Sequence, residues 1–324
     1  MKYTKNALNV LAARTFKGIG RAWFAKNWKP NLAGSDVVDL INQTRKGEAP
    51  IALSDFESKR HTILSLLMNS QESIDGVVAI GDENFPVHRG NVKNSEQPIF
   101  LFYKGDLSLL SLVNRNIAVI GLLNPTAEIE QRERKVVAEL VGMGATIVSG
   151  LAMGCDSIAH RETLERGGKT VAILPSPLSA ILPASNRPLA QDILAHGGLL
   201  VSEYLTEAKS RMALSSRYQE RDRLQALFSD GIILSASYAK NPLGLDSGSR
   251  LAMGYAAEYG IPRAVIYDDS EANNPMFDLN RQYMREDSKV VVIREESTTS
   301  DIDRLQRSCK HQTTYPIYIQ GRIL

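Results

Sequence analysis

The chain has 324 residues, of which 43% are apolar and 23% charged, and its formal net charge is +2. This size allows a large core with a smaller second domain. The small net charge excludes a polycation that attracts nucleic acid as a whole, so such binding would need a local basic surface. No apolar run has the length of a signal-peptide core or a membrane span, and we expect a cytoplasmic protein without membrane contact.

Residues 1–75 have a helical hydrophobic pattern, and we expect a small helical N-terminal domain there. Within it, Lys17–Arg21 contains two glycines. This break is similar to a glycine hairpin that holds a nucleic-acid backbone through its amides, and equally to a plain turn between helices. Residues 76–110 are expected to form a connecting segment with one extended element.

From residue 117 onward, short β-branched runs alternate with helical patterns. Glu128–Val141, for example, places its apolar residues on one helical face. The six predicted strands are Ile117–Gly121, Thr146–Gly150, Thr170–Leu174, Leu199–Glu203, Gly231–Ala236 and Arg263–Tyr267.

Apolar strands separated by single helices are typical of a parallel sheet covered on both faces. We therefore predict an α/β fold: a doubly wound, mostly parallel Rossmann-like sheet over residues 111–295. The polar tail, 296–324, is expected to add a strand or to be a disordered end. Ligands of such sheets bind beyond the carboxyl ends of the strands.

The segment SGLAMGCDSIAH, residues 149–160, follows the second of these strands. Gly150 and Gly154 allow close approach of the backbone, and Asp156 or Ser157 is expected to cap the next helix. Free amides and a helix N-terminus suit an anion such as phosphate. A purely structural turn is the alternative. Cys155, within this turn, is expected to be a buried small thiol, because neither cysteine has metal-ligand spacing.

Similar turns follow the other strands. After the first strand, Asn124 or Thr126 is expected to cap a helix, and after the third, Ser185 or Asn186. Arg221 and Arg223 are expected at a helix start, where two guanidiniums can hold phosphates, although an arginine-rich solvated face is the alternative. Together these turns predict a site for an extended phosphodiester or a nucleotide. Its candidate residues are Gly121, Asn124, Thr126, Gly150, Gly154, Asn186, Arg187, Arg221, Arg223, Ser247, Gly248, Ser249 and Arg250.

Signals of catalysis and of cofactors are missing from the sequence. It has no G-x-G-x-x-G dinucleotide motif, no G-x-x-x-x-G-K-[ST] phosphate loop and no G-x-S-x-G nucleophile elbow. No His, Cys or Asp cluster has metal spacing. His160 and Glu203 are conceivable general bases, but structural hydrogen bonding is the favoured role for both. We predict a binding protein that is not an enzyme, with no metal and no cofactor.

Taken in order, these motifs resemble the DNA-processing protein A (DprA/Smf) family of bacteria. SGLAMGCDSIAH is similar to its S-G-x-A-x-G-I-D-x-x-A-H signature, and Tyr218–Leu224 to its F-P-x-R-N-R-I segment. The resemblance implies a Rossmann-like domain that binds single-stranded DNA, a SAM-like helical domain, homodimerisation, and loading of a RecA-type recombinase during recombination or transformation.

The sequence also departs from that family. Leu123 stands where the family has an arginine, and Asp222 replaces the asparagine between the two arginines. Both changes are expected to weaken DNA binding. No winged-helix domain is recognisable at the C-terminus. Two alternatives therefore stay open: a nucleotide sensor or phosphoribohydrolase-like domain of the same fold, for instance in a defence locus, and a scaffold that acts through protein contacts.

Overall fold

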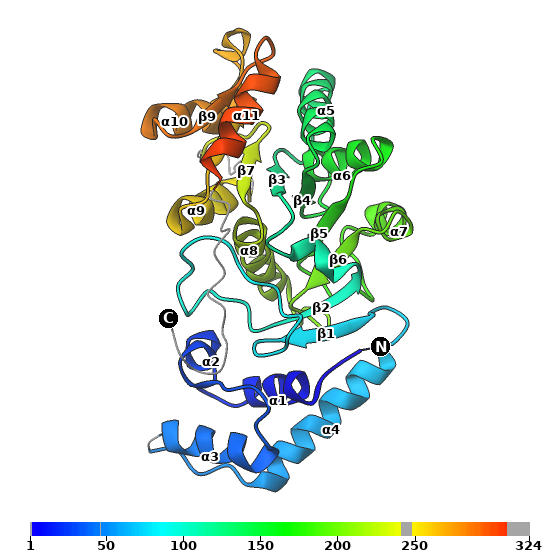
Figure 1. The fold of residues 1–324 in the computed structure, drawn as a ribbon, viewed down its shortest axis with the longest axis vertical. Coiled ribbons are helices and arrows are strands. Elements are labelled where there is room, and N and C mark those ends of the chain that lie inside the picture. Colours follow the sequence, from blue (N-terminus) through cyan, green and yellow to red (C-terminus); the bar gives the residue numbers. More distant parts are fainter. Residues whose placement is uncertain (1, 46, 241–247, 310–324) are drawn as a thin grey trace.

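A computed structural model describes residues 2–45, 47–240 and 248–309 (Figure 1). Four helices come first, and a single sheet alternating with further helices follows. The helices of the described residues are α1 (Lys5–Arg14), α2 (Arg21–Asn27), α3 (Gly34–Thr44), α4 (Leu53–Asn69), α5 (Ala127–Gly142), α6 (Cys155–Glu165), α7 (Arg187–Ala195), α8 (Arg211–Leu227), α9 (Ser249–Tyr259), α10 (Asp278–Glu286) and α11 (Thr298–Ser308). The strands are β1 (Gly76–Ala79), β2 (Phe100–Gly105), β3 (Asn116–Ile120), β4 (Thr146–Ser149), β5 (Thr170–Leu174), β6 (Leu199–Ser202), β7 (Gly231–Leu234), β8 (Arg263–Ile266) and β9 (Val291–Ile293).

The sheet has the order β1-β2-β6-β5-β4-β3-β7-β8-β9. Strands β3 to β9 are mutually parallel, whereas β2 runs antiparallel to both β1 and β6. The predicted α/β class is confirmed, and all six predicted strands are present to within two residues at each end. The expected single extended element in 76–110 is wrong, because this segment contributes two strands, β1 and β2, to one edge of the sheet.

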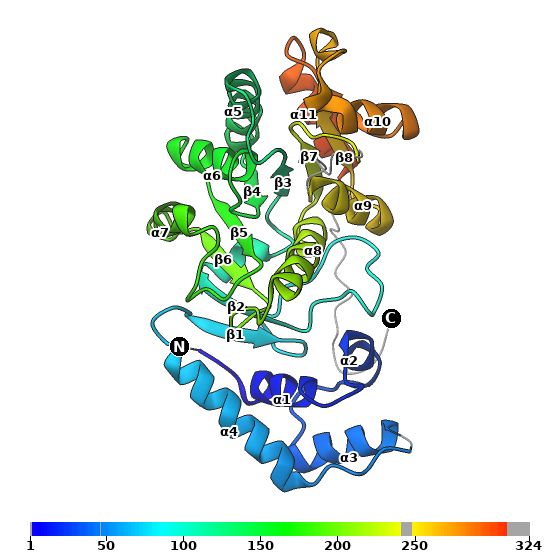
Figure 2. The same cartoon turned by 180° about the vertical axis from the view of Figure 1, so that it is seen from behind.

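Alternating strand residues separate the two faces of the sheet. On β5, Val171 and Ile173 face the core beneath α8, α9 and α10, whereas Ala172 and Leu174 face the opposite side. That opposite side is covered by α5, α6 and α11 over β3, β4 and β7 to β9. Near β5, β6 and the β1–β2 edge, α7 and the N-terminal helices cover it. Figure 2 shows the same arrangement from behind, with the helical region at the β1 end of the sheet.

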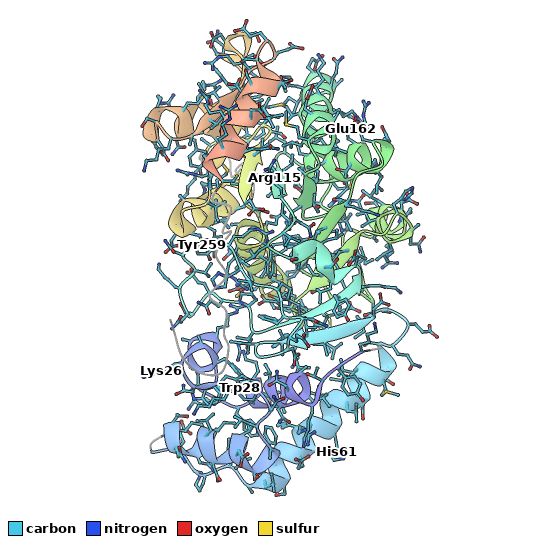
Figure 3. All side chains as sticks on the ribbon, viewed as in Figure 1. Lys26, Trp28, His61, Arg115, Glu162 and Tyr259 are labelled. Atoms are coloured by element: carbon cyan, nitrogen blue, oxygen red, sulfur yellow. The ribbon has the colours of Figure 1, made fainter. Side chains whose placement is uncertain are left out.

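The N-terminal helices have a core of their own that continues into the sheet. Phe24 and Phe56 are fully buried there. Trp28, labelled among these helices in Figure 3, donates from Nε1 to Asn6 Oδ1 at 3.0 Å. In the break before α2, Ile19 is buried as well, and the backbone of Gly18 has φ +85°. This break therefore places Arg21, the first residue of α2, against the sheet domain, the part of the chain that contains the sheet and its covering helices.

The polar tail is helical where it is described. Helix α11 packs Ile302 and Leu305 against the sheet, so the expected strand or disordered end is wrong for residues 298–308, because the apolar stripe of this segment has helical spacing. Residues 310–324 lie outside the described residues. Within the described part of the chain, no helix is long and apolar enough to cross a membrane.

The carboxyl ends of β3 to β9 meet at one edge, which we call the strand-end edge. After β3 the chain continues to β4 on one side, whereas the neighbour on the other side, β7, comes much later. Such a switch point leaves a crevice in which doubly wound sheets bind ligands.

Candidate nucleic-acid interface

A cavity of about 430 Å³ opens at this switch point. We call it the strand-end pocket. It lies beyond the ends of β3 and β4 and is flanked by α8 and the start of α9. Its lining includes Gly121, Leu123, Met153, Asp156, Pro183, Tyr218, Arg221, Asp222, Gln225, Gly248 and Ser249. The structure thus brings together four of the predicted residues, Gly121, Arg221, Gly248 and Ser249.

The glycine turn after β4 forms one side of the pocket, but part of its hydrogen-bonding capacity is already used. Asp156 Oδ2 accepts from the backbone N–H of Gly150 at 3.1 Å and of Ala152 at 3.3 Å. The expectation that Asp156 or Ser157 caps α6 is wrong, because Gly154, with φ +70°, occupies the N-cap position without a side-chain bond. The turn therefore already holds an anion, the carboxylate of Asp156.

Asn186 keeps this turn in place from beneath. The two N–H groups of its Nδ2 share three acceptors: the carbonyl oxygens of Leu151 at 2.8 Å and Ala152 at 3.1 Å, and Ser157 Oγ at 2.9 Å. Asn186 is buried and its side chain does not cap α7, in contrast to the capping role expected for it. Its position supports the pocket wall from inside the protein.

The floor of the pocket is a buried charged triad. Arg221 donates from Nη1 to Asp156 at 3.3 Å and pairs through Nε with Asp222 Oδ1 at 3.0 Å. A Cβ atom on Gly150 would lie 1.1 Å from Arg221 Nη1, so glycine is required where this guanidinium passes. Burial and the like charge of Asp156 raise the pKa of Asp222 to about 7, against the opposing effect of Arg221. With both carboxyls ionised, the triad carries a net charge of −1.

Arg223 is buried on the same helix and pairs elsewhere. It is 1% exposed and donates from Nη2 to Glu203 at 2.6 Å and from Nε to Glu220 at 3.2 Å. Arg21 completes the cluster with Glu203 at 2.9 Å and Glu220 at 2.8 Å. We call these four side chains the domain clasp, because Arg21 belongs to α2 and the other three to the sheet domain.

The expectation that Arg221 and Arg223 stand at a helix start is wrong. Helix α8 begins ten residues earlier, at Arg211, with Ser210 as its N-cap, and both arginines lie in its second half. Helical spacing turns this part of α8 toward the sheet, so the guanidiniums meet protein carboxylates rather than solvent.

A second cavity, of about 420 Å³, adjoins the strand-end pocket along α8 and at Leu182–Pro183. It is lined by four cations, Arg187, Lys209, Arg211 and Arg217, together with Glu207. We call it the cationic cleft. Arg217 stacks over the Tyr204 ring at 4.1 Å from its centroid and donates to the carbonyl of Thr206 at 2.7 Å. Arg187, Lys209 and Arg211 are exposed and have no ion-pair partner among the described residues.

Lys209 and Arg211 are absent from the residues predicted by sequence. The signal that could have drawn attention to them is weak: both follow the carboxyl end of β6 and flank the start of a helix. Without the position of α8, nothing in the sequence distinguishes them from other surface cations.

The family model described as "DNA recombination-mediator protein A" matches residues 76–302, about two thirds of the chain. This chain belongs to that family. The resemblance stated from the motifs is thereby confirmed.

Curated relatives carry the family name. The DNA processing protein DprA of Bacillus subtilis is 32% identical over 165 residues, which cover 51% of this chain and 52% of the relative. DprA of Streptococcus pneumoniae is 32% identical over 176 residues, 53% of this chain and 58% of the relative. The chain thus spans about half the length of the curated relatives it matches.

Two solved structures have the same fold. The X-ray structure of S. pneumoniae DprA matches with a TM-score of 0.68 at 23% identity, and the match covers 93% of this chain and 98% of the other. A structure of DNA processing protein A from Helicobacter pylori, whose title concerns its single-stranded DNA binding mode, matches with a TM-score of 0.55 at 25% identity. That match covers 72% of this chain and 97% of the other.

Of the other predicted residues in this member of the recombination-mediator family, Asn124 and Thr126 follow β3, and Arg250 lies on α9. Thr126 caps α5 by accepting from the N–H of Ile129 at 3.4 Å, as predicted, and Asn124 is exposed beside it. Ser249 Oγ donates to the carbonyl of Gly121 at 3.1 Å, and this hydrogen bond joins the start of α9 to the turn that follows β3. Arg250 is half-buried on α9. Ser247 lies outside the described residues.

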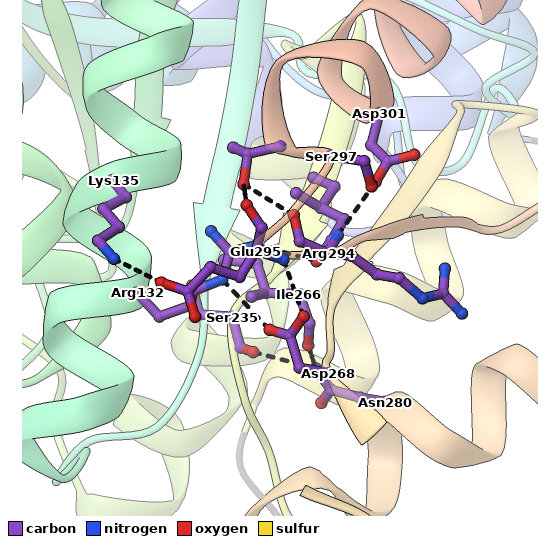
Figure 4. Close-up of polar contacts among 12 residues, drawn as sticks. Arg132, Lys135, Ser235, Ile266, Asp268, Asn280, Arg294, Glu295, Ser297 and Asp301 are labelled. Carbon is purple, nitrogen blue, oxygen red and sulfur yellow. Dashed lines mark hydrogen bonds and ion pairs between the residues drawn. The ribbon is translucent and has the colours of Figure 1, made fainter. Parts of the chain in front are cut away.

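At the β8–β9 end of the edge, cations of α5 pair with carboxylates that follow β8 and β9 (Figure 4). Arg132 pairs with Asp268 at 3.4 Å, and Lys135 pairs with Glu295 at 2.5 Å. The Asp268 carboxylate also accepts from the Glu295 N–H at 2.8 Å. In the cationic cleft, by contrast, Arg187, Lys209 and Arg211 have no carboxylate partner among the described residues.

Proposed function

We propose that this protein binds single-stranded DNA along the cationic cleft and acts as a recombination mediator rather than an enzyme. The observation that carries this proposal is the placement of Arg187, Lys209 and Arg211 around one cavity without carboxylate partners in the described structure. Together with Arg217 they outnumber the single lining carboxylate, Glu207. Such a groove tracks a phosphate backbone without reading sequence.

Membership in the family supports the same conclusion, as does the single-stranded DNA named for the H. pylori relative. Of the residues predicted from sequence, Arg187 is the one whose guanidinium is presented to this cleft. Gly121, Gly248 and Ser249 shape the neighbouring pocket and Arg221 lies at its floor, whereas Arg223 belongs to the domain clasp. We also propose that the protein is a homodimer and delivers the strand to a RecA-type recombinase, as the family resemblance implies.

The test is a titration of a fluorescent thymidine oligonucleotide at several salt concentrations, followed by anisotropy. In Lys209→Ala/Arg211→Ala we expect weaker binding and a log K against log salt slope smaller by about 1.4, about 0.7 for each lost phosphate contact. The matched control is Arg166→Ala/Lys169→Ala, which removes two exposed cations at the opposite edge of the sheet. Equal slopes for both double variants and the wild type would contradict the proposal.

The dimer and the recombinase are tested separately. Sedimentation of the free protein should give twice the monomer mass of 35.7 kDa. Addition of the protein should also speed assembly of a RecA-type recombinase on strands coated with single-strand-binding protein. The nucleotide-sensor alternative is disfavoured above about pH 7, where Asp222 is ionised and the triad in the strand-end pocket, with a net charge of −1, repels a nucleoside phosphate.

A further inference from the structure

The cations of this chain are unevenly distributed along the sequence. Residues 1–35 contain seven lysines and arginines and no aspartate or glutamate. Because the whole chain has a net charge of +2, residues 36–324 have a net charge of −5. The positive segment comprises α1, the glycine break after it and α2, and it lies at the β1 end of the sheet (Figure 1). The cationic cleft contains none of these cations.

Three cations surround the glycine break. Arg14, the last residue of α1, donates to the carbonyl oxygen of Ile19 inside the break at 3.3 Å. Lys17 pairs with Glu48 at 3.1 Å, and Arg45, which follows α3, pairs with the same carboxylate at 3.5 Å. Among the described residues, Glu48 is the one carboxylate that pairs with any of the three, so the group has a net charge of +2. Arg45 Nε is buried and has no hydrogen-bond partner in that part of the chain.

A fourth cation, Lys26, extends this surface along α2 (Figure 3). Trp23 donates from Nε1 to Thr44 Oγ1 at 2.7 Å, so α2 lies against the end of α3. Lys26 follows Trp23 by three residues and is therefore its neighbour on the helix surface. It is exposed and has no ion-pair partner within the described ranges. We give the name hairpin patch to the four cations Arg14, Lys17, Lys26 and Arg45.

The patch presents hydrogen-bond donors that a phosphate can reach. The Lys17 side chain is 83% exposed, and an exposed ion pair such as Lys17–Glu48 is weak, so a phosphate can replace the carboxylate. Gly18, beside it, is exposed, and its N–H has no acceptor among the residues that the structure describes. Ammonium, guanidinium and backbone N–H groups are the donors with which proteins contact phosphate oxygens.

Two features of the patch favour a duplex over a single strand. Duplex DNA has one negative charge per about 1.7 Å of its axis, against about 3.4 Å for one strand, so clustered exposed cations contact more phosphate on a duplex. Single-strand sites also stack unpaired bases on aromatic rings. The rings beside the patch, Trp23 and Trp28, instead pack on the buried Phe24, with centroids 5.2 and 5.1 Å from its ring.

We propose that the hairpin patch binds the phosphate backbone of duplex DNA, at a site separate from the cationic cleft. The patch is formed by α1, α2 and the end of α3, whereas the cleft belongs to the sheet domain. This inference goes beyond the proposed function, because a duplex contacts the patch whether or not a strand occupies the cleft.

The experiment measures binding of the 324-residue chain to a blunt duplex of about 20 base pairs, by fluorescence anisotropy at several salt concentrations. In Lys17→Ala/Lys26→Ala we expect weaker binding and a log K against log salt slope smaller by about 1.8, about 0.9 for each lost phosphate contact. Both side chains are exposed, so the variant should fold. The matched control is Lys2→Ala/Lys5→Ala, which removes two exposed cations at the other end of α1 and should keep the wild-type slope.

A thymidine oligonucleotide separates this inference from the proposed function. Lys17→Ala/Lys26→Ala should bind it as tightly as the wild type does, because the single strand lies in the cleft. Three results would overturn the inference: no binding of the duplex by the wild type, equal duplex slopes for the two lysine variants, or an equal loss of duplex and oligonucleotide binding in Lys17→Ala/Lys26→Ala. If the duplex series behaves as expected and the oligonucleotide is not bound, the proposed function alone fails.

Discussion

Arg223 donates to Glu203 at 2.6 Å from the interior of α8, and this pair joins the sheet domain to Arg21 of the helical region. Residues 21 and 203 are 182 positions apart, so the contact is purely tertiary. The guanidinium of Arg223 also reaches the backbone carbonyl of Glu96. A side chain expected to meet DNA phosphates instead holds two parts of the protein together.

The domain clasp predicts a graded loss of stability. Arg223→Ala leaves Glu203 with one partner and a buried carbonyl without a donor, and it should lower the free energy of unfolding by about 3–5 kcal/mol. Arg21→Ala, at a half-buried position, should cost about 1–2 kcal/mol. Urea denaturation measures both. Arg304→Ala, an exposed arginine on α11, should change stability by less than about 0.5 kcal/mol. Equal effects of all three variants would show that the clasp adds nothing.

Gly150→Ala should destabilise the pocket floor. The added Cβ would lie 1.1 Å from Arg221 Nη1 and 2.7 Å from Asp156 Oδ2, so the guanidinium must leave its carboxylates. We expect a loss of about 3 kcal/mol or more in unfolding free energy. The control is Gly142→Ala at the end of α5, where a Cβ meets nothing within 4 Å. That variant should be neutral or more stable by up to about 1 kcal/mol.

Glu133 predicts a dependence of stability on pH. It is fully buried on α5, and neither carboxyl oxygen has a hydrogen-bond partner among the described residues. Burial raises the pKa of Glu133 to about 8, from an ordinary value of 4.5, against the opposing effect of the nearby Cys155 and Ser235 and with a smaller contribution from the like charges of Asp156 and Glu130. The folded protein therefore keeps a proton that the unfolded chain loses. Its stability should fall as pH rises from about 4.5 to about 8, by up to about 1.4 kcal/mol per pH unit.

Urea denaturation of wild type and Glu133→Gln between pH 5 and 9 checks this slope. The glutamine variant should lack the contribution of Glu133 and should exceed the wild type most at pH 8 and above. Asp222, whose pKa is about 7, titrates in both proteins, so the difference between their curves isolates Glu133. Glu139→Gln, an exposed position on the same helix, should leave the curve unchanged. Parallel curves for wild type and Glu133→Gln would refute the assignment.

Asn186→Ala should loosen the glycine turn. The substitution removes a buried amide whose two N–H groups share three acceptors, and it should cost about 1–3 kcal/mol. Hydrogen exchange should show faster exchange for the backbone amides of residues 150–154. Asn273→Ala, at an exposed position, is the control. Unchanged exchange in 150–154 would mean that the turn does not depend on Asn186.

Local patterns determined much of this fold. β-branched runs of four to six residues produce β3 to β8, because such residues fill a sheet that is buried on both faces. Thr126 caps α5 because its hydroxyl accepts from an N–H in the first turn of that helix. The signature around Gly150 and Gly154 indicated the family. These features depend on neighbours in sequence, which is why they were predictable. Strands β1 and β9 were not predicted, because each has only three or four residues and is stabilised by pairing with a neighbouring strand, β2 or β8.

Only the tertiary structure decided what the charged residues do. Arg221 and Arg223 have the residue types and spacing of a phosphate site, yet the orientation of α8 turns them to Asp156 and Glu203. The same helix presents Arg211 and Arg217 to the cationic cleft instead. Whether a guanidinium meets a carboxylate or solvent depends on distant segments that packing brings within a few ångströms, and the strength of charge interactions depends on that distance and on burial.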